Sequence, residues 1–334
     1  MSPLIRTRPR IVLSALLAVL LPAGTTACTA EQSSAPRAPR TQISVGTPFT
    51  PYDIRPLLKP RKKYIGVAID GVSRSIAPVA AFNRGIGKKV NMVTIYAAVS
   101  DHFDSRGARR IWRAGAIPLI MWEPFSPSLA TIARGAIDDH LRQFATAVRA
   151  LNIPVAISFG HEMNGFWYPW GTRKNSPADF VRAWRHIHRV FSETGTTNVI
   201  WVWNPNVINP VPRVALRPYY PGDSYVDWIG LIGYYTLTGA HTFTTLFGPT
   251  MRQVRRFSDK PFIITETASQ PGPRRVRDVA DLLKGVASSR DVIGFIWFNY
   301  RKRADWRLPA RSPELLTFRR YVAADIFGFD PTRS

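Results

Sequence analysis

The stretch from Val155 to Glu162 reads VAISFGHE, an apolar run that ends in a histidine and a glutamate. Side chains alternate along a strand, so Ala156 and Ser158 share one face with Glu162, and the larger residues occupy the other face. Small side chains suit the crowded interior of a parallel barrel, whereas large ones can pack beneath helices. The stretch therefore predicts a strand that delivers Glu162 to the mouth of a barrel.

Seven similar apolar runs accompany this strand along the chain. They are Tyr64–Asp70, Val90–Ala97, Ile117–Trp122, Val199–Trp203, Trp228–Tyr234, Phe262–Glu266 and Ile293–Phe298. Amphipathic segments lie between them, including Ala136–Leu151, Ala178–Thr194, Met251–Phe257 and Val276–Ala287. Eight alternations of strand and helix favour an α/β fold of the closed (β/α)8 TIM barrel type over an open doubly wound sheet.

Local signals support this interpretation. Ser176 and Pro177 are typical of a helix start, with serine as the cap and proline at the first helical position. Residues 70–73 read DGVS and lack the glycine spacing of a dinucleotide-binding loop after the first strand.

The N-terminus has the layout of an export signal. Arginines up to Arg10 precede an apolar stretch, Ile11–Leu21, which is too short to span a bilayer comfortably and is followed by small residues. The single cysteine, Cys28, comes directly after Thr-Thr-Ala, a pattern that resembles the lipobox of bacterial lipoproteins, although Thr25 stands where an aliphatic residue is usual. We expect residues 1–28 to be a signal peptide with a lipidated Cys28, with ordinary signal-peptidase cleavage as the alternative. The protein would then be secreted or attached as a lipoprotein to the outer face of the bacterial membrane.

The chain after this signal divides by composition. Residues 29–60 are rich in Pro, Ser, Thr, Arg and Gln and show no sustained apolar period, so they predict a flexible linker. Residues 61–330 are then expected to form one folded domain. A lone cysteine leaves no partner for an internal disulfide.

The composition bears on partners. The formal net charge of +23 over 334 residues favours anionic partners, but the basic residues are dispersed and form no recognised nucleic-acid motif, so we expect no nucleic-acid partner. Ten tryptophans are compatible with a carbohydrate site, because sugar rings present apolar C–H faces to aromatic side chains. Core packing is the alternative for any one of them.

The expected strand ends carry the candidate chemistry. Phe262, Ile264 and Glu266 should share a face, which brings Glu266 to the same mouth as Glu162. Two carboxyl groups on one sugar linkage can cleave it, one as acid and the other as nucleophile, and a separation of roughly 5–5.5 Å predicts retention of anomeric configuration. Trp122, Asn164 and Trp203 also lie at strand ends and are candidates for substrate contact.

Metal catalysis is not indicated. His161 and Glu162 would need a second histidine three residues after the glutamate to form a zinc-binding helix motif, and Gly165 stands there. We therefore expect an enzyme that acts as a monomer, without a cofactor or catalytic metal.

The segment 157–171, ISFGHEMNGFWYPWG, resembles the acid/base motif of glycoside hydrolase family 26, a clan A group of (β/α)8 barrels that includes β-mannanases and β-1,3-1,4-glucanases. Further motifs extend the resemblance over residues 61–320: AWRHI (183–187), NVIWVWNPN (198–206), YYPGD (219–223), VDWIGL (226–231), KPFIITET (260–267) and FIWFN (295–299).

The resemblance implies roles for individual residues. Glu162 matches the proton donor and Glu266 the nucleophile of a retaining, double-displacement mechanism. Tyr234 matches the tyrosine that hydrogen-bonds the nucleophile, and His161 matches the histidine that sets the environment of the acid and touches the substrate. Trp167 and Trp297 match aromatics that line the sugar subsites.

Departures from the family leave the substrate open. Ile232 and Tyr235 replace the Asp and Asn found around Tyr234 in many members, and the third strand ends in Trp122-Glu123-Pro124. The expected substrate is a β-linked polysaccharide, either β-1,4-mannan, mixed-linkage β-glucan or another wall or capsule β-glycan. The alternatives are a non-catalytic carbohydrate-binding barrel of the cell envelope and, on charge alone, a binder of anionic polymers or nucleic acid.

Overall fold

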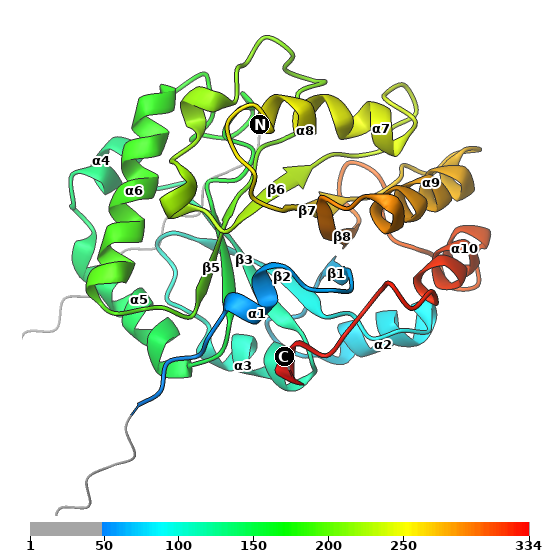
Figure 1. Ribbon diagram of the computed structural model, residues 1–334, viewed down its shortest axis with the longest axis horizontal. Coiled ribbons are helices and arrows are strands. Elements are labelled where there is room, and N and C mark those ends of the chain that lie inside the picture. Colours follow the sequence, from blue (N-terminus) through cyan, green and yellow to red (C-terminus); the bar gives the residue numbers. More distant parts are fainter. Residues whose placement is uncertain (1–48, 334) are drawn as a thin grey trace, which may run out of the picture. The chain divides into compact units, whose positions relative to one another are not determined.

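The computed structural model describes residues 49–333, which belong to one compact unit (Figure 1). The predicted signal peptide, Cys28 and the linker up to residue 48 lie outside the described residues. Within residues 49–333, no helix has both the length and the apolar character needed to cross a membrane.

Eight parallel strands close into a barrel in which each strand pairs with its neighbours in sequence and β8 pairs with β1. The strands are β1 Tyr64–Ile69, β2 Met92–Ala98, β3 Ile117–Glu123, β4 Val155–Phe159, β5 Val199–Trp203, β6 Trp228–Ile232, β7 Phe262–Thr267 and β8 Val292–Asn299. The predicted (β/α)8 fold is confirmed. Three strands end earlier than predicted: β1 at Ile69, β4 at Phe159 and β6 at Ile232.

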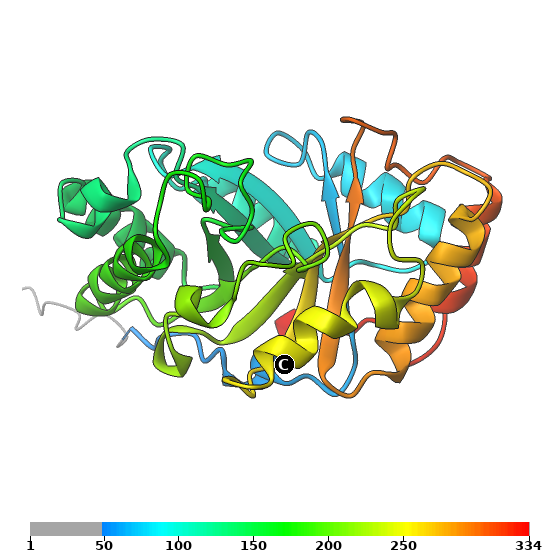
Figure 2. The same cartoon turned by 90° about the horizontal axis from the view of Figure 1, so that it is seen from above.

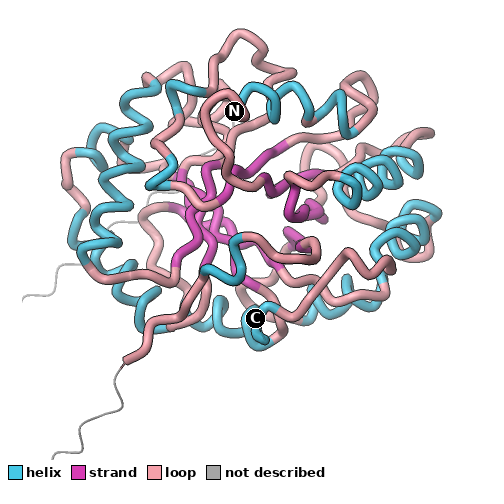
Figure 3. The backbone as a smooth tube through the Cα atoms, in the orientation of Figure 1, coloured by secondary structure: helices cyan, strands magenta, loops and turns pink. Residues whose placement is uncertain are grey.

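Helices surround the strands on the outside of the barrel, as the tube in Figure 3 shows. They are α1 Arg55–Leu58, α2 Ala77–Ile86, α3 Ser105–Arg113, α4 Leu129–Ala133, α5 Asp138–Leu151, α6 Pro177–Glu193, α7 Phe243–Leu246, α8 Gly248–Val254, α9 Arg275–Ser288 and α10 Pro313–Val322. Short 3-10 turns occupy Arg217–Tyr219, Asp223–Tyr225 and Pro331–Arg333. The first two stand between β5 and β6, where a regular barrel would have a helix.

The helix start predicted at Ser176 is confirmed. Its side chain accepts a hydrogen bond from the backbone N–H of Asp179, and the Asp179 carboxylate accepts one from the Ser176 N–H. This reciprocal pair satisfies two donors that would otherwise lack a partner at the N-terminus of α6.

The packing outside the barrel is aromatic. On the outer face of β4, Phe159 packs against Phe180 and Trp184 of α6. Its neighbours on the sequence, Ala156 and Ser158, belong to the opposite face and are fully buried. The alternation predicted for this strand therefore holds as far as Phe159.

The predicted linker boundary at residue 60 is wrong, because residues 49–60 belong to the folded unit. The Tyr52 N–H donates to Asn152 Oδ1 at 2.8 Å, and the Tyr52 ring packs edge-on against Trp112. The carbonyls of Leu57 and Leu58 in α1 accept hydrogen bonds from Tyr64 and Trp228, the first residues of β1 and β6. Composition missed this docking because the few apolar residues involved are separated by prolines and charges.

Candidate active site at the carboxyl ends of the strands

Glu162 reaches the barrel mouth through an irregular backbone rather than through the strand itself. After β4 ends at Phe159, Gly160 and Glu162 adopt left-handed conformations with φ of 57° and 56°. The Glu162 N–H donates to the Asn204 carbonyl at 2.7 Å, which ties this turn to the end of β5. Strand alternation therefore predicted the correct location for Glu162, but a turn and not the strand produces it.

Two donors hold the Glu162 carboxyl group. The Trp167 indole N–H donates to Oε2 at 2.7 Å, and the Asn206 amide donates to Oε1. Gly165 leaves room for the indole, since a Cβ at this glycine would lie 2.4 Å from the Trp167 ring. The tryptophan and asparagine together fix the orientation of the carboxyl group.

Asn164 supports this arrangement indirectly. It is fully buried, its amide donates to the Asn206 carbonyl at 2.9 Å, and its Oδ1 accepts from the Asn206 N–H at 2.9 Å. The structure thus corrects the prediction that Asn164 contacts substrate, because both ends of its amide are used to position Asn206.

Glu266 lies at the end of β7, and the register of this strand shifts on both of its edges near the glutamate. Ile264 pairs with Phe295, whose ring packs outward against Phe318 of α10. Thr265 points the other way, and its hydroxyl donates to Asn204 across the barrel at 2.6 Å. The prediction that Phe262, Ile264 and Glu266 share an inward face is therefore wrong. The local irregularity turns Glu266 toward the mouth.

Two tyrosines hold the Glu266 carboxyl group. Tyr96 of β2 donates its hydroxyl to Oε2, and Tyr234, just beyond β6, donates to Oε1. The role expected for Tyr234 thus agrees with its geometry. Tyr96 escaped the prediction, although its place near the end of β2 was a signal that could have found it.

The charge of Glu266 acts on the carboxyl group of Glu162. Burial, and next the charge of Glu266, raise the pKa of Glu162 to about 7 against the opposing hydrogen bonds from Trp167 and Asn206. Burial also raises the pKa of Glu266, opposed by the hydroxyls of Tyr234 and Tyr96 and by the charge of Lys302. The pair can hold a proton on Glu162 near neutral pH while Glu266 is ionised.

His161 is buried beside this pair and is held as a neutral ring. Burial, and next the charge of Lys302, lower its pKa to about 3. Its Nε2 lies 3.3 Å from the Tyr168 hydroxyl, and its carbonyl accepts from the Trp170 indole at 2.7 Å. Tyr168 in turn stacks on Trp170 at 4.3 Å between ring centroids. This aromatic group stabilises the segment that carries Glu162.

Three tryptophans predicted to contact substrate lie in the core instead. Each is fully buried and points away from the barrel interior. Trp122 packs against Phe144 of α5, Trp203 against Phe257 after α8, and Trp297 edge-on against Phe318 of α10. Only Trp167 of the predicted tryptophans is exposed beside the carboxyl pair, with 37% of its surface accessible.

The sequence also failed to single out several groups near the pair. One of these groups is a third carboxyl group, that of Glu123 at the end of β3, on which the charge of Glu266 acts. Burial is the main cause that raises the pKa of Glu123 to about 7. Trp306 packs against Tyr234 at 4.8 Å between centroids, and the Lys302 ammonium lies 5.6 Å from the Tyr96 ring centroid. Asn206 stood inside a family motif, but no local pattern marked Trp306 or Lys302.

Within residues 49–333, no group of three or more His, Cys, Asp or Glu side chains is arranged to hold a metal ion. The fold and the site together define a (β/α)8 barrel with carboxyl groups at the ends of strands four and seven.

Comparisons with known proteins agree with this definition. The model of glycosyl hydrolase family 26 matches residues 99–262. Residues 99–262 are therefore assigned to that family, which confirms the resemblance drawn from the motifs.

Individual relatives have longer chains. Endoglucanase H of Acetivibrio thermocellus is 29% identical over 268 residues, which is 76% of this chain and 30% of the relative. Mannan endo-1,4-beta-mannosidase A and B of Caldalkalibacillus mannanilyticus is 34% identical over 113 residues, or 32% of this chain and 20% of the relative. The chain thus spans less than a third of the length of either relative.

Solved structures share the fold. The catalytic domain of the Bacillus sp. JAMB-750 family 26 endo-beta-1,4-mannanase superposes with a TM-score of 0.65 at 17% identity, covering 81% of this chain and 88% of that one. The modular endo-beta-1,4-mannanase of Cellulomonas fimi gives 0.67 at 16% identity, covering 82% and 74%.

Proposed function

We propose that the protein is a retaining glycoside hydrolase that cleaves a β-linked polysaccharide of the β-1,4-mannan or mixed-linkage β-glucan type. The observation that carries the proposal is the electrostatically coupled pair Glu162 and Glu266, each held by its own hydrogen-bond donors at the barrel mouth. The family assignment and the names of the relatives, an endoglucanase and endo-mannosidases, support the substrate class.

In the first half of the proposed reaction, Glu162 protonates the glycosidic oxygen while the ionised Glu266 attacks the anomeric carbon. The bond to the leaving sugar breaks as the bond to Glu266 forms, which leaves a covalent glycosyl-enzyme. Glu162, now ionised, takes a proton from water, and the water oxygen displaces Glu266 from the anomeric carbon. Both carboxyl groups return to their starting protonation states.

The environments of the two groups suit these roles. Glu162 must exchange a proton, and its pKa of about 7 makes either form accessible near neutral pH. Glu266 must be an anion, and two phenol hydroxyls stabilise its charge. Trp167 can offer its exposed indole face to a sugar ring while its N–H holds Glu162.

The test compares Glu162→Gln and Glu266→Gln with Glu193→Gln, which replaces an exposed glutamate near the end of α6. Each protein is incubated with glucomannan, galactomannan and barley mixed-linkage β-glucan, and new reducing ends are measured. We expect the first two variants to lose at least about 10³-fold in rate and the third to match the wild type. NMR of the first products should show retained anomeric configuration.

Wild-type protein that binds these glycans but releases no reducing ends would establish the non-catalytic binding barrel instead. Full activity in either active-site variant would overturn the roles of the two glutamates.

We also propose that the protein is exported and attached to the membrane through a lipid on Cys28, on the strength of the N-terminal sequence pattern. Expressed in a bacterium, the wild type should partition into the detergent phase of Triton X-114, and Cys28→Ser should move to the aqueous phase. Equal partitioning of both would reject the lipid anchor.

A further inference from the structure

A short hairpin, residues 300–306, follows β8 and contacts residues that surround the carboxyl pair. Its ends are joined by the Trp306 N–H, which donates to the Tyr300 carbonyl at 3.0 Å, and Arg301 and Asp305 form an antiparallel bridge. The Lys302 N–H donates to the Ala304 carbonyl at 3.0 Å and tightens the tip. These bonds give residues 300–306 a defined shape.

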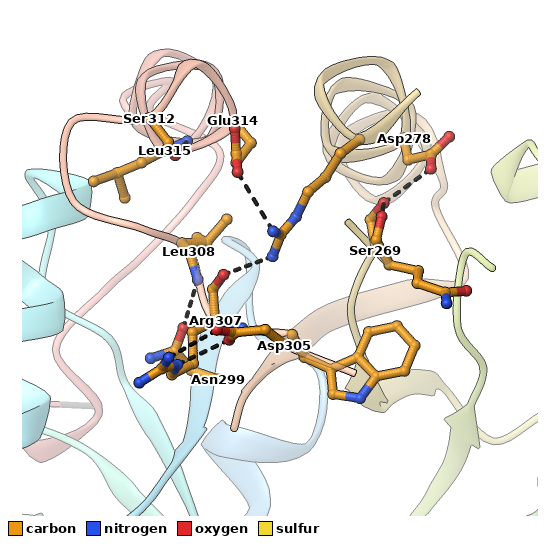
Figure 4. A network of polar contacts seen from close by, with 12 residues as sticks. Ser269, Asp278, Asn299, Asp305, Arg307, Leu308, Ser312, Glu314 and Leu315 are labelled. Carbon is orange, nitrogen blue, oxygen red and sulfur yellow. Dashed lines mark hydrogen bonds and ion pairs between the residues drawn. The ribbon is translucent and has the colours of Figure 1, made fainter. Parts of the chain in front are cut away.

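The base of this hairpin is anchored to the helices beyond it. Figure 4 shows the bonds between Asp305 and Arg307, the bond from the Leu308 N–H to Asn299, and Glu314 on α10. Arg275 of α9 donates to the Arg307 carbonyl at 2.6 Å and pairs with Glu314 at 3.4 Å. The hairpin is therefore fixed relative to the barrel.

The hairpin contacts both tyrosines that hold Glu266. Trp306 packs against Tyr234 at 4.8 Å between ring centroids. The Lys302 ammonium lies 5.6 Å from the Tyr96 ring centroid, 5.5 Å from that of Phe298 and 6.0 Å from that of Tyr300. Three aromatic faces thus hold one ammonium group above the site.

Three carboxyl groups in one site require compensating charge. Double displacement uses Glu162 and Glu266, which leaves Glu123 without a role in the reaction. Among residues 49–333, no Lys or Arg nitrogen lies within 4.0 Å of any of these three carboxyl groups. The charge of Lys302 nevertheless lowers the pKa of Glu123, Glu162 and Glu266. Its ammonium group lies over the ring of Tyr96, whose hydroxyl donates to Glu266, and it is bound to none of the three carboxyl groups.

Other charged and titratable groups surround this site. They are Asp70 after β1, Tyr96 on β2, Asp101 after β2, His161 and Tyr168 after β4, Tyr234 after β6, and Tyr300 and Arg303 on the hairpin. Arg303 lowers the pKa of Tyr168, whereas the charge of Lys302 acts on the carboxyl groups themselves. Asp70 and Asp101 add negative charge and so increase the need for a cation.

We propose that Lys302 is the counter-ion of the Glu123, Glu162 and Glu266 cluster and that it keeps Glu266 ionised for attack. This inference rests on the proposed function for its catalytic part, and it makes Lys302 a positioning residue that acts through Glu266. The aromatic faces hold the ammonium near the carboxyl groups without pairing it with Glu266. The oxygen atoms of the nucleophile are then left to the two tyrosines and to the sugar.

The first experiment measures the carboxyl groups without any substrate. Full-length protein labelled with ¹³C at the glutamate carboxyl carbons is titrated by NMR as wild type, Lys302→Met, Lys302→Arg and Arg303→Met. Resonances are assigned with Glu123→Gln, Glu162→Gln and Glu266→Gln. Because a cation favours the ionised form, its loss in Lys302→Met should raise the pKa of Glu266 by about one unit. Glu162 and Glu123 should shift in the same direction.

Lys302→Arg should restore values near the wild type, and Arg303→Met should leave those of the three glutamates unchanged. Arg303 is the matched control because it is the next residue on the hairpin and its removal changes the net charge equally. An unshifted Glu266 in Lys302→Met would overturn the proposal. An equal shift in Arg303→Met would overturn it too, because the effect would then belong to the overall charge.

The second experiment uses turnover on the glycan that the wild type cleaves. In Lys302→Met, the profile of kcat/KM against pH should move to higher pH by about one unit. This applies to the acid limb, which reports Glu266, and to the alkaline limb, which reports Glu162. In the wild type, 1 M NaCl shortens the screening length to about 3 Å and should move the profile the same way, with little effect in Lys302→Met. If the NMR shifts are seen but no glycan is cleaved, the proposed function fails and the counter-ion stands. If the glycan is cleaved but the limbs of the profile do not shift in Lys302→Met, the proposed function stands and the counter-ion proposal fails.

Discussion

Removal of the Arg275 side chain tests the energetics of the anchor beneath the hairpin. The ion pair between Arg275 and Glu314 is largely shielded from water, with side-chain exposures of 7% and 13% and a separation of 3.4 Å. Arg275 also donates to the Arg307 carbonyl at 2.6 Å. Arg275→Met leaves the largely shielded carboxylate of Glu314 without its cation and the Arg307 carbonyl without its donor.

The magnitude follows from that burial. Breaking a buried ion pair by removal of one partner costs about 3–5 kcal/mol, because the remaining charge is uncompensated. Arg142 provides the matched control: it pairs with Asp139 at 2.6 Å, but the exposures are 50% and 91%. A surface pair of that kind contributes about 0–1 kcal/mol, so Arg142→Met should be nearly neutral.

The assay is denaturant unfolding of wild type, both single variants and the double variant Arg275→Met/Glu314→Met. We expect the double variant to lose less free energy of unfolding than Arg275→Met alone, because it leaves no charge behind. If Arg275→Met costs no more than Arg142→Met, or if the two buried substitutions are additive, the reasoning is refuted.

Three further predictions concern the carboxyl groups. At φ 56°, the backbone of position 162 disfavours any side chain by about 1 kcal/mol. Glu162→Gly should therefore unfold at no lower denaturant concentration than Glu162→Ala. A clearly more stable alanine variant would argue against the left-handed backbone. Tyr234→Phe removes a donor that lowers the pKa of Glu266. Its loss should raise the acid limb of kcat/KM by about 1–2 pH units, from about 1.5–3 kcal/mol for a hydrogen bond to a charged group, and an unmoved acid limb would contradict this. Asn206→Ala removes a donor that lowers the pKa of Glu162. The alkaline limb of kcat/KM should therefore rise by about one pH unit while the acid limb stays in place. Movement of the acid limb alone would mean that Glu162 is the nucleophile and Glu266 the acid.

The sequence predicted the architecture well because the barrel depends on repeated, local patterns. Eight apolar runs and the Ser176 cap are visible without knowledge of any long-range contact. In the view from above in Figure 2, the strands lie between helices that come from both halves of the chain. The docking of Tyr52 onto Asn152 joins residues 100 positions apart, and no local pattern announces it.

The site residues also differ in whether a pattern in the sequence marks them or only a long-range contact places them. Glu162 and Glu266 were predicted from strand ends, and Tyr234 and Trp167 from the family resemblance; these four residues lie together in the structure. Trp297 was assigned to the mouth by resemblance, although its neighbour Phe298 packs against Tyr234 and alternation then points Trp297 outward. Tyr96, near the end of β2, contacts Glu266 across 170 residues of sequence, and its strand-end position alone did not identify that partner.

Both carboxyl groups lie where the sheet is irregular, and this coincidence has a physical reason. In a regular barrel, residues at the strand ends alternate strictly between the interior and the helices, which limits how many side chains can face one point. The left-handed turn at Gly160 and Glu162 and the register shift of β7 relax that limit. Asn204 connects the two irregular places, since its carbonyl accepts from the Glu162 N–H and its side chain accepts from Thr265, next to Glu266. The positions of the two glutamates are thus coupled through one buried asparagine at the end of β5.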